Sequence, residues 1–344
     1  MAFWARRADA QSRSARAARL SPHHSPPVTP EEEAALEGLA PRIGRLHMRQ
    51  RLGLERDFEA HVFGPGRHFF HLENWYSMHG LVRTGLRVLG LTTRARRNAR
   101  RIQVREHDVP LPHLPAEFDG FTLLHLTDLH LDAAPDLTAA LIDAVRPLQY
   151  DLCVLTGDYR ARTFGPFDAA LARMAELRPH LKGTVYAILG NHDSLRMVPP
   201  LQAMGYTLLI NEWTALRRGG AAIYLSGIED AHFYRLDNFH RAADAIPPQA
   251  VSILLSHTPE AYRHAAHADF DLMLCGHTHG GQLCLPGGRP ILTDTDSPRR
   301  FARGSWRFHQ MIGYTSTGSG TSIVDARLNC PPEVTLHRLR RARP

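Results

Sequence analysis

Short polar motifs rich in aspartate and histidine recur between residues 128 and 279 of this chain of 344 residues. Asp128 and His130 stand two residues apart, a spacing that projects both side chains to the same side of an extended segment. Carboxylate, imidazole and amide groups together, without thiolates, suit Fe, Mn or Zn. The residues that could form such a centre are Asp128, His130, Asp158, Asn191, His192, Asp193, His257, His277 and His279.

Each motif follows an apolar run that has the length and composition of a buried strand. The runs at 121–127, 152–157 and 183–190 alternate with helical patterns at 136–145 and 167–177. This order predicts an α/β sheet whose strands are buried on both faces. Because the carboxyl ends of strands in such a sheet meet at one crevice, the motifs can form a single site.

After residue 211 the apolar runs become shorter and predict a second, more antiparallel sheet packed against the first. These runs lie at 252–257, 271–277, 282–286, 311–316 and 334–339. Two of the motifs, Ser256-His257 and the segment 275–281, fall at the ends of such runs. The second sheet is therefore expected to contribute to the same site.

The ordered motifs D-x-H, G-D, G-N-H-D, H and G-H-x-H resemble the calcineurin-like metallophosphoesterases. In this sequence they are Asp128 to His130, Gly157-Asp158, Gly190 to Asp193, His257 and Gly276 to His279. The resemblance covers roughly residues 116–340. It implies an α/β fold, a four-layer αββα sandwich of two mixed β-sheets flanked by helices. It also implies a phosphoesterase with two divalent or trivalent metal ions (Mn, Fe or Zn) that hydrolyses a phosphodiester or phosphomonoester through a metal-bound hydroxide.

The resemblance also assigns a role to each residue of the motifs. Asp158 corresponds to the carboxylate that bridges the two metals, and His192 to a histidine that is not a ligand. His192 would hydrogen-bond a phosphoryl oxygen or protonate the leaving group, and Asp193 would orient it. The remaining ligands are Asp128, His130 and His279 for one metal and Asn191, His257 and His277 for the other.

Other polar residues near the motifs have simpler interpretations. His125, on the first predicted strand, is expected to be a packed strand residue. Glu229 and Asp230 follow a predicted strand, so they can either contact substrate or serve as polar residues of the loop.

The net charge of +7 is distributed unevenly along the chain. Residues 1–115 contain 19 arginines and 11 acidic residues, which leaves 22 basic and 23 acidic residues for 116–344. A nuclease of the same fold is an alternative function, but no basic excess surrounds the motifs, and nucleic acid is therefore not expected as a partner. A non-catalytic metal-binding interaction scaffold is a second alternative; the presence of Asn191, His192 and His279 argues against it.

The first third of the chain is expected to be an accessory region. Residues 1–30 read as a disordered basic arm and linker, 31–101 as a basic helical N-terminal extension and 102–344 as the catalytic domain. Within residues 69–105, aromatic residues precede a basic amphipathic helix that either lies on an anionic membrane surface or packs on the catalytic domain. Neither a spanning helix nor an export signal is predicted. Deleting residues 1–100 is accordingly expected to spare activity on a soluble substrate.

Further residues within and after the motifs restrict the resemblance to one branch of the family. D-L-H-L-D, G-H-T-H-G-G-Q and the segment Asn329 to Val334 are similar to a bacterial membrane-associated phosphodiesterase branch that includes UDP-2,3-diacylglucosamine hydrolases. The four cysteines lack C-x-x-C pairing, which favours a reducing compartment. We therefore expect a cytoplasmic enzyme, peripheral at the inner face of the membrane, with a phosphoester substrate.

Overall fold

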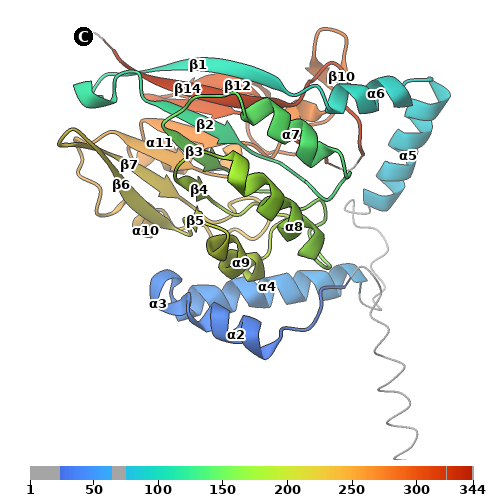
Figure 1. The fold of residues 1–344 in the computed structure, drawn as a ribbon, viewed down its shortest axis with the longest axis horizontal. Helices are drawn as coiled ribbons and strands as arrows, with labels where there is room; N and C mark the ends of the chain where they lie inside the picture. Colours follow the sequence, from blue (N-terminus) through green and yellow to red (C-terminus); the bar gives the residue numbers. More distant parts are fainter. Residues whose placement is uncertain (1–23, 64–74, 323, 343–344) are drawn as a thin grey trace, which may run out of the picture.

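Two six-stranded mixed sheets pack face to face in a computed structural model that describes residues 24–63, 75–322 and 324–342. Helices flank the sheets (Figure 1), as expected for the α/β sandwich. The helices of four or more residues are α2 (Pro30–Glu37), α3 (Ala40–Ile43), α4 (Arg45–Phe63), α5 (Trp75–Val88), α6 (Thr92–Ala99), α7 (Leu137–Val145), α8 (Asp168–Leu177), α9 (Val198–Ala203), α10 (Phe239–Ala243) and α11 (Tyr262–His267). The strands are β1 (Gln103–Leu111), β2 (Thr122–Leu126), β3 (Leu152–Leu155), β4 (Val185–Ala187), β5 (Tyr206–Leu208), β6 (Glu212–Arg218), β7 (Ala221–Gly227), β8 (Ser252–Leu255), β9 (Leu272–Cys275), β10 (Cys284–Leu285), β11 (Arg289–Pro290), β12 (Gly304–Phe308), β13 (Met311–Thr315) and β14 (Glu333–Arg341).

The first sheet has the strand order β1-β14-β2-β3-β4-β5. β2, β3, β4 and β5 run parallel to one another, as the alternation of strands and helices predicted. Every residue of β3 is buried, which explains its continuous apolar sequence. Apolar side chains of α7, α8 and α9 share a buried cluster with this sheet, so these helices form one outer layer.

The second sheet has the strand order β12-β13-β9-β8-β7-β6. Its centre is parallel, since β13, β9, β8 and β7 pair in parallel, and only the edge strands β12 and β6 pair antiparallel. Apolar residues from both sheets, such as Leu123, Val154 and Ile253, form the core between them. α10 and α11 pack on the outer face of the second sheet.

Two details of the predicted second sheet were wrong. The run at 334–339 belongs to β14, which lies in the first sheet, and the run at 282–286 contains β10, which pairs with β11 in a separate two-stranded sheet. The second sheet is more antiparallel than the first, as expected, because two of its five strand pairs are antiparallel and only one of the first sheet's five is. β14 pairs antiparallel with β2 and parallel with β1. The last strand of the chain therefore inserts beside the first two, and it covers an edge of β2 that would otherwise lack a partner.

The helices before β1 fall into two groups. α2 to α4 lie below α9 in Figure 1, where Leu36, Leu39, Ile43 and Met48 are buried in the cluster that also contains α9 residues. α5 lies at another side of the molecule, and only its Leu86 is buried among the side chains described from residue 80 onward. Residues 1–23 of the basic arm expected at 1–30 lie outside the described residues, and so do residues 69–74, the first part of the segment in which aromatic residues are expected to precede the helix.

Among the described residues, no helix is both long and apolar enough to cross a membrane.

Candidate metal centre

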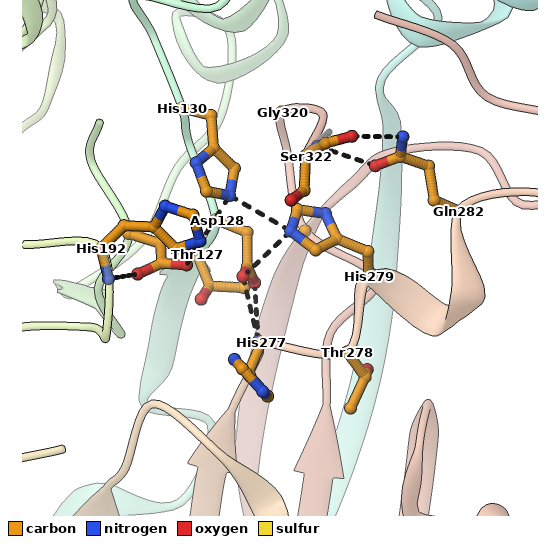
Figure 2. A network of polar contacts seen from close by, with 12 residues as sticks. Thr127, Asp128, His130, His192, His277, Thr278, His279, Gln282, Gly320 and Ser322 are labelled. Atoms are coloured by element: carbon orange, nitrogen blue, oxygen red, sulfur yellow. Dashed lines mark hydrogen bonds and ion pairs between the residues drawn. The ribbon is translucent and has the colours of Figure 1, made fainter. Parts of the chain in front are cut away.

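Both sheets deliver polar side chains to one place from the carboxyl ends of their strands. Asp128 and Asp158 follow β2 and β3, Asn191 follows β4, and His257 follows β8. The turn after β9 carries the pair of histidines 277 and 279. Figure 2 shows the side chains of Asp128, His130, His192 and His279 gathered around a common space.

One group of three ligand atoms consists of Asp128, His130 and His279, all of them buried. The two imidazole Nε2 atoms are 3.2 Å apart, and His279 Nε2 is 3.4 Å from Asp128 Oδ1 (Figure 2). The outward nitrogen of His130, Nδ1, lies 2.8 Å from the carbonyl oxygen of Arg160, which leaves Nε2 to face the group.

A second group contains Asp158, His257 and His277. Asn191 belongs to it as well, because its Oδ1 lies 2.9 Å from His257 Nε2 and 3.0 Å from His277 Nδ1. His257 turns its other nitrogen, Nδ1, toward the carbonyl oxygen of Thr156 at 2.7 Å. The structure thus brings together both sets of side chains that the sequence assigned to a first and a second metal.

Asp158 lies between the two groups. Its Oδ2 atom is 3.3 Å from His257 Nε2 and 3.7 Å from His130 Nε2. The other oxygen, Oδ1, accepts a hydrogen bond of 2.9 Å from the backbone N–H of His192. One carboxylate oxygen is therefore directed at both groups at once.

The backbone is held in a demanding conformation at this centre. Five of its residues have a positive φ, namely Asp128 (51°), His130 (41°), Asp158 (59°), His277 (70°) and His279 (50°). Such left-handed conformations are costly for residues other than glycine, and they cluster at functional sites where the surrounding structure imposes them. The backbone before two of the motifs approaches the aspartates closely, and glycines make this possible. A Cβ on Gly190 would lie 2.2 Å from Asp158 Oδ1, and one on Gly276 would lie 2.2 Å from Asp128 Oδ2.

The charge states of the histidine and aspartate side chains in the centre favour binding of a cation. Burial, the neighbouring histidines His232 and His257, and nearby charges hold the pKa of His277 well below its usual range, so its ring is neutral with a free lone pair. Burial acts against the ionised form of Asp158, but its surrounding histidines outweigh this and keep the pKa of the carboxyl well below its usual value. Buried imidazoles around an ionised carboxylate form a donor set that fits Mn, Fe or Zn once each ring presents a lone pair.

His192 belongs to neither group. Its Nε2 atom is 3.9 Å from Asp158 Oδ2, its Nδ1 atom is 3.4 Å from Thr163 Oγ1, and its side chain is 20% exposed. The ring therefore stands at the edge of the centre, where it remains accessible to a substrate.

Asp193 differs from the expectation that it orients the His192 ring. Its carboxylate accepts hydrogen bonds from the backbone N–H groups of Asp158 (2.7 Å), Tyr159 (2.9 Å) and Gly190 (2.9 Å). Among the described residues, none of its hydrogen bonds reaches the imidazole. Asp193 therefore ties together the two loops that carry Asp158 and His192, and it acts on the backbone.

The structure also decides between the interpretations of the other polar residues. Glu229 is buried and paired with Arg51, and Asp230 caps a turn by accepting from the N–H groups of residues 232 to 234, so both serve the protein's own structure. His125 is a packed strand residue, as expected, and its Nε2 lies 2.9 Å from Thr156 Oγ1.

Sequence reasoning missed His232, which lies beside the second group. Its ring centroid is 4.3 Å from that of His277, and its Nδ1 is 3.0 Å from both carboxylate oxygens of Glu260. Burial disfavours the protonated ring, but Glu260 outweighs it and raises the pKa of His232. His232 could not be recognised from a motif with regular spacing, because its partners His277 and Glu260 lie on separate loops.

Known proteins share the part of the sequence that carries both groups. Residues 121–281, which include every residue of both groups, match the family model described as calcineurin-like phosphoesterase. The phosphodiesterase YaeI of Escherichia coli is 32% identical over 239 residues, covering 64% of this chain and 82% of that protein. The metallophosphoesterase YkuE of Bacillus subtilis, whose function is uncharacterised, is 27% identical over 251 residues, covering 70% of this chain and 86% of that protein. A solved archaeal phosphodiesterase aligns with a TM-score of 0.33 at 12% identity, over 58% of this chain and 84% of that one.

Proposed function

Because the chain belongs to the calcineurin-like metallophosphoesterases and is a metal-dependent phosphoester hydrolase, we propose that it works with two metal ions. Asp128, His130 and His279 would hold one ion, and Asn191, His257 and His277 the other. The observation that supports this arrangement is the position of Asp158, whose Oδ2 atom faces His130 in one group and His257 in the other. An anionic bridge at that point would offset the repulsion between two cations.

The metals would acidify a water molecule and compensate the charge of the phosphoryl group, the two functions of paired metal sites. His192 is the residue of this chain that we assign to proton transfer. Its partly exposed ring can donate a proton to the departing oxygen or a hydrogen bond to a phosphoryl oxygen. Asp193 keeps the loop of His192 against the loop of Asp158 through the backbone hydrogen bonds described above.

A phosphodiester is the substrate class that we propose. The name of the relative from Escherichia coli, a phosphodiesterase, supports a diester over a monoester. The motifs that are similar to UDP-2,3-diacylglucosamine hydrolases lead us to propose further that the diester is linked to a lipid, with the enzyme at the inner face of the membrane.

The exposed face of α5 supports work at a membrane surface. Leu81 and Val88 are 68% and 79% exposed, while Leu86 on another side of the helix is buried against Val324 and Ala326. Arg83 and Arg87 are exposed on the same helix. We propose that this apolar stripe and its arginines contact anionic lipid. In this proposal residues 31–101 form the extension and 102–344 the catalytic domain.

Two substitutions test the roles of Asp158 and His192 separately. Asp158→Asn removes the negative charge between the groups, so the bound metal should fall below two ions per chain and hydrolysis of an aryl phosphodiester should be lost. His192→Ala should keep both metals and lower kcat by about 100-fold or more. Asp143→Asn, an exposed residue of α7, is the matched control and should behave as wild type. Unchanged turnover in both Asp158→Asn and His192→Ala would contradict the mechanism.

A further inference from the structure

Arg51 connects the helical extension to the candidate metal centre. This α4 residue is completely buried. Its Nη2 atom donates a hydrogen bond of 2.8 Å to the carbonyl oxygen of Asp193, and its Nε atom lies 2.5 Å from Glu229 Oε1. The guanidinium carbon stands 3.3 Å from the ring centroid of Tyr234. A residue that is 142 positions earlier in the sequence therefore holds the backbone directly after His192.

Glu55, one helical turn later, holds the next two residues of the same loop. Its carboxylate accepts hydrogen bonds from Ser194 Oγ at 2.6 Å and from the backbone N–H of Leu195 at 2.8 Å. Arg51 and Glu55 are themselves paired at 3.1 Å. The two side chains thus fix residues 193 to 195, and they leave the ring of His192 free to face the centre.

Arg51 also joins loops from both sheets. Asp193 lies in the loop after β4 of the first sheet, and Glu229 lies in the loop after β7 of the second. Burying a guanidinium is unfavourable unless it is paired and hydrogen-bonded, and here carboxylates from two elements and a carbonyl oxygen provide those partners. A buried network of this kind fixes the relative position of the groups that it connects.

We propose that α4 is part of the active site and that Arg51 and Glu55 are positioning residues for His192. This inference rests on the proposed role of His192 in proton transfer. That role requires placement within a fraction of an ångström, because small misalignments of a catalytic group cost orders of magnitude in rate. The side-chain contacts of the ring nitrogens are long, at 3.4 Å to Thr163 Oγ1 and 3.9 Å to Asp158 Oδ2. The backbone of its loop must therefore provide the precision.

The alternative is that these contacts only attach the extension to the catalytic domain. Other contacts do so at a distance from the metal centre: Arg241 donates hydrogen bonds from its guanidinium to the carbonyl oxygens of Arg42 and Ile43. Arg241→Met therefore removes an attachment of the extension without touching the loop of His192. It serves as the matched control.

A double-mutant cycle separates positioning from attachment. The paired variant Arg51→Met/Glu229→Gln removes the buried cation together with the buried anion Glu229. The remaining partner, Glu55, is partly exposed and keeps its hydrogen bonds from Ser194 and Leu195. It is measured in the full-length, metal-loaded enzyme with His192 present and in the His192→Ala background. The substrates are two phosphodiesters, one with a p-nitrophenolate and one with an alkoxide leaving group.

With His192 present, kcat should fall about 10-fold or more, because a displaced proton donor forfeits part of the usual contribution of general acid catalysis. KM and metal content should stay unchanged. The loss should be larger for the alkoxide, whose departure depends more on protonation. In the His192→Ala background the paired variant should have no further effect on kcat, and Arg241→Met should stay within about twofold of its parent, as a site without a functional role does.

An equal loss of kcat in both backgrounds, or a loss of metal, would overturn the inference and leave the proposed function intact. If His192→Ala alone left turnover of both substrates unchanged, the proposed function itself would fail. Glu55→Ala, at a partly exposed position, provides a second test by the same criteria if the paired variant does not fold.

Discussion

His257 links metal binding to protons in the candidate centre. Burial favours its neutral form, but Asp158 and Asp128 outweigh burial and raise the pKa of His257 to about 10. In the metal-free protein at pH 8 the ring is therefore protonated, and it must lose this proton before its Nε2 atom can bind a cation. Metal uptake at pH 8 should release about one proton per chain from this residue.

Calorimetry in two buffers of different ionisation enthalpy measures this release. The apparent binding enthalpy should differ between the buffers, and metal affinity should weaken as the pH falls. His257→Asn should reduce the difference between the buffers. Identical enthalpies in both buffers for the wild-type chain would contradict the assignment of His257.

The residue types of the centre could be predicted from the sequence, whereas the residues that support them could not. Aspartates and histidines stand at the ends of apolar runs, so their convergence follows from the geometry of parallel strands. Arg51 and Glu55 carry no such signal, because a charged pair at i and i+4 on a helix usually faces solvent. Their partners lie 139 or more positions later, and only the tertiary fold reveals the contact.

Three strands of the first sheet, β2, β3 and β4, could also be predicted, whereas β1, β5 and the place of β14 could not. A run such as 334–339 shows its strand character locally, but the choice of a neighbour depends on contacts that are distant in sequence. Its insertion between β1 and β2 creates a row of three histidines. His107 Nδ1 lies 3.0 Å from His337 Nδ1, and His337 Nε2 lies 3.3 Å from His125 Nδ1.

This row should make the first sheet sensitive to acid. Burial lowers the pKa of His125 to about 3, and burial together with His125 and His107 lowers that of His337. The unfolded chain binds protons at these residues below about pH 6.5, whereas the folded chain does not. The stability is therefore fully present above pH 6.5 and is lost as the pH falls below it, by up to about 1.4 kcal/mol per pH unit for each such histidine.

Urea unfolding of wild type and His125→Gln at pH 7, 6 and 5 measures this dependence. The variant should be less stable at pH 7, because the contact with Thr156 changes, but its stability should decline less steeply with acid. His240→Gln, an exposed position in α10, is the control and should keep the wild-type slope. Parallel slopes for wild type and His125→Gln would contradict the prediction.

The helices before β1 fall into two groups that pack against different parts of the molecule. The excess of basic residues in the first third of the chain could be located from the sequence, which left open whether the extension packs on the catalytic domain or faces a membrane. α2 to α4 pack against α9 and the cluster beside the first sheet, whereas α5 leaves an apolar stripe exposed. The contacts of α4 also change the expectation for removing residues 1–100: the loss of Arg51 and Glu55 should lower the activity even on a soluble substrate.

Membrane contact of the whole protein should depend on the exposed face of α5. The double substitution Leu81→Asp/Val88→Asp should reduce cosedimentation with anionic vesicles by about 10-fold or more, since each side chain loses apolar area that would enter the interface. Leu46→Asp, at a position of α4 that is 65% exposed, is the matched control. Binding of the wild-type protein to the vesicles should also weaken at high salt, because salt screens the attraction between the arginines and the anionic lipid. Equal binding by both variants would rule out this face.

The most direct test of a two-metal centre is reconstitution of the metal-free enzyme. Mn²⁺ or Zn²⁺ is added in known amounts, and the bound metal per chain is measured together with hydrolysis of an aryl phosphodiester. Activity should require the second ion and reach its maximum at two ions per chain, while Asp158→Asn should fail to reach that maximum. Full activity at one ion per chain, or in the metal-free protein, would contradict the two-metal mechanism.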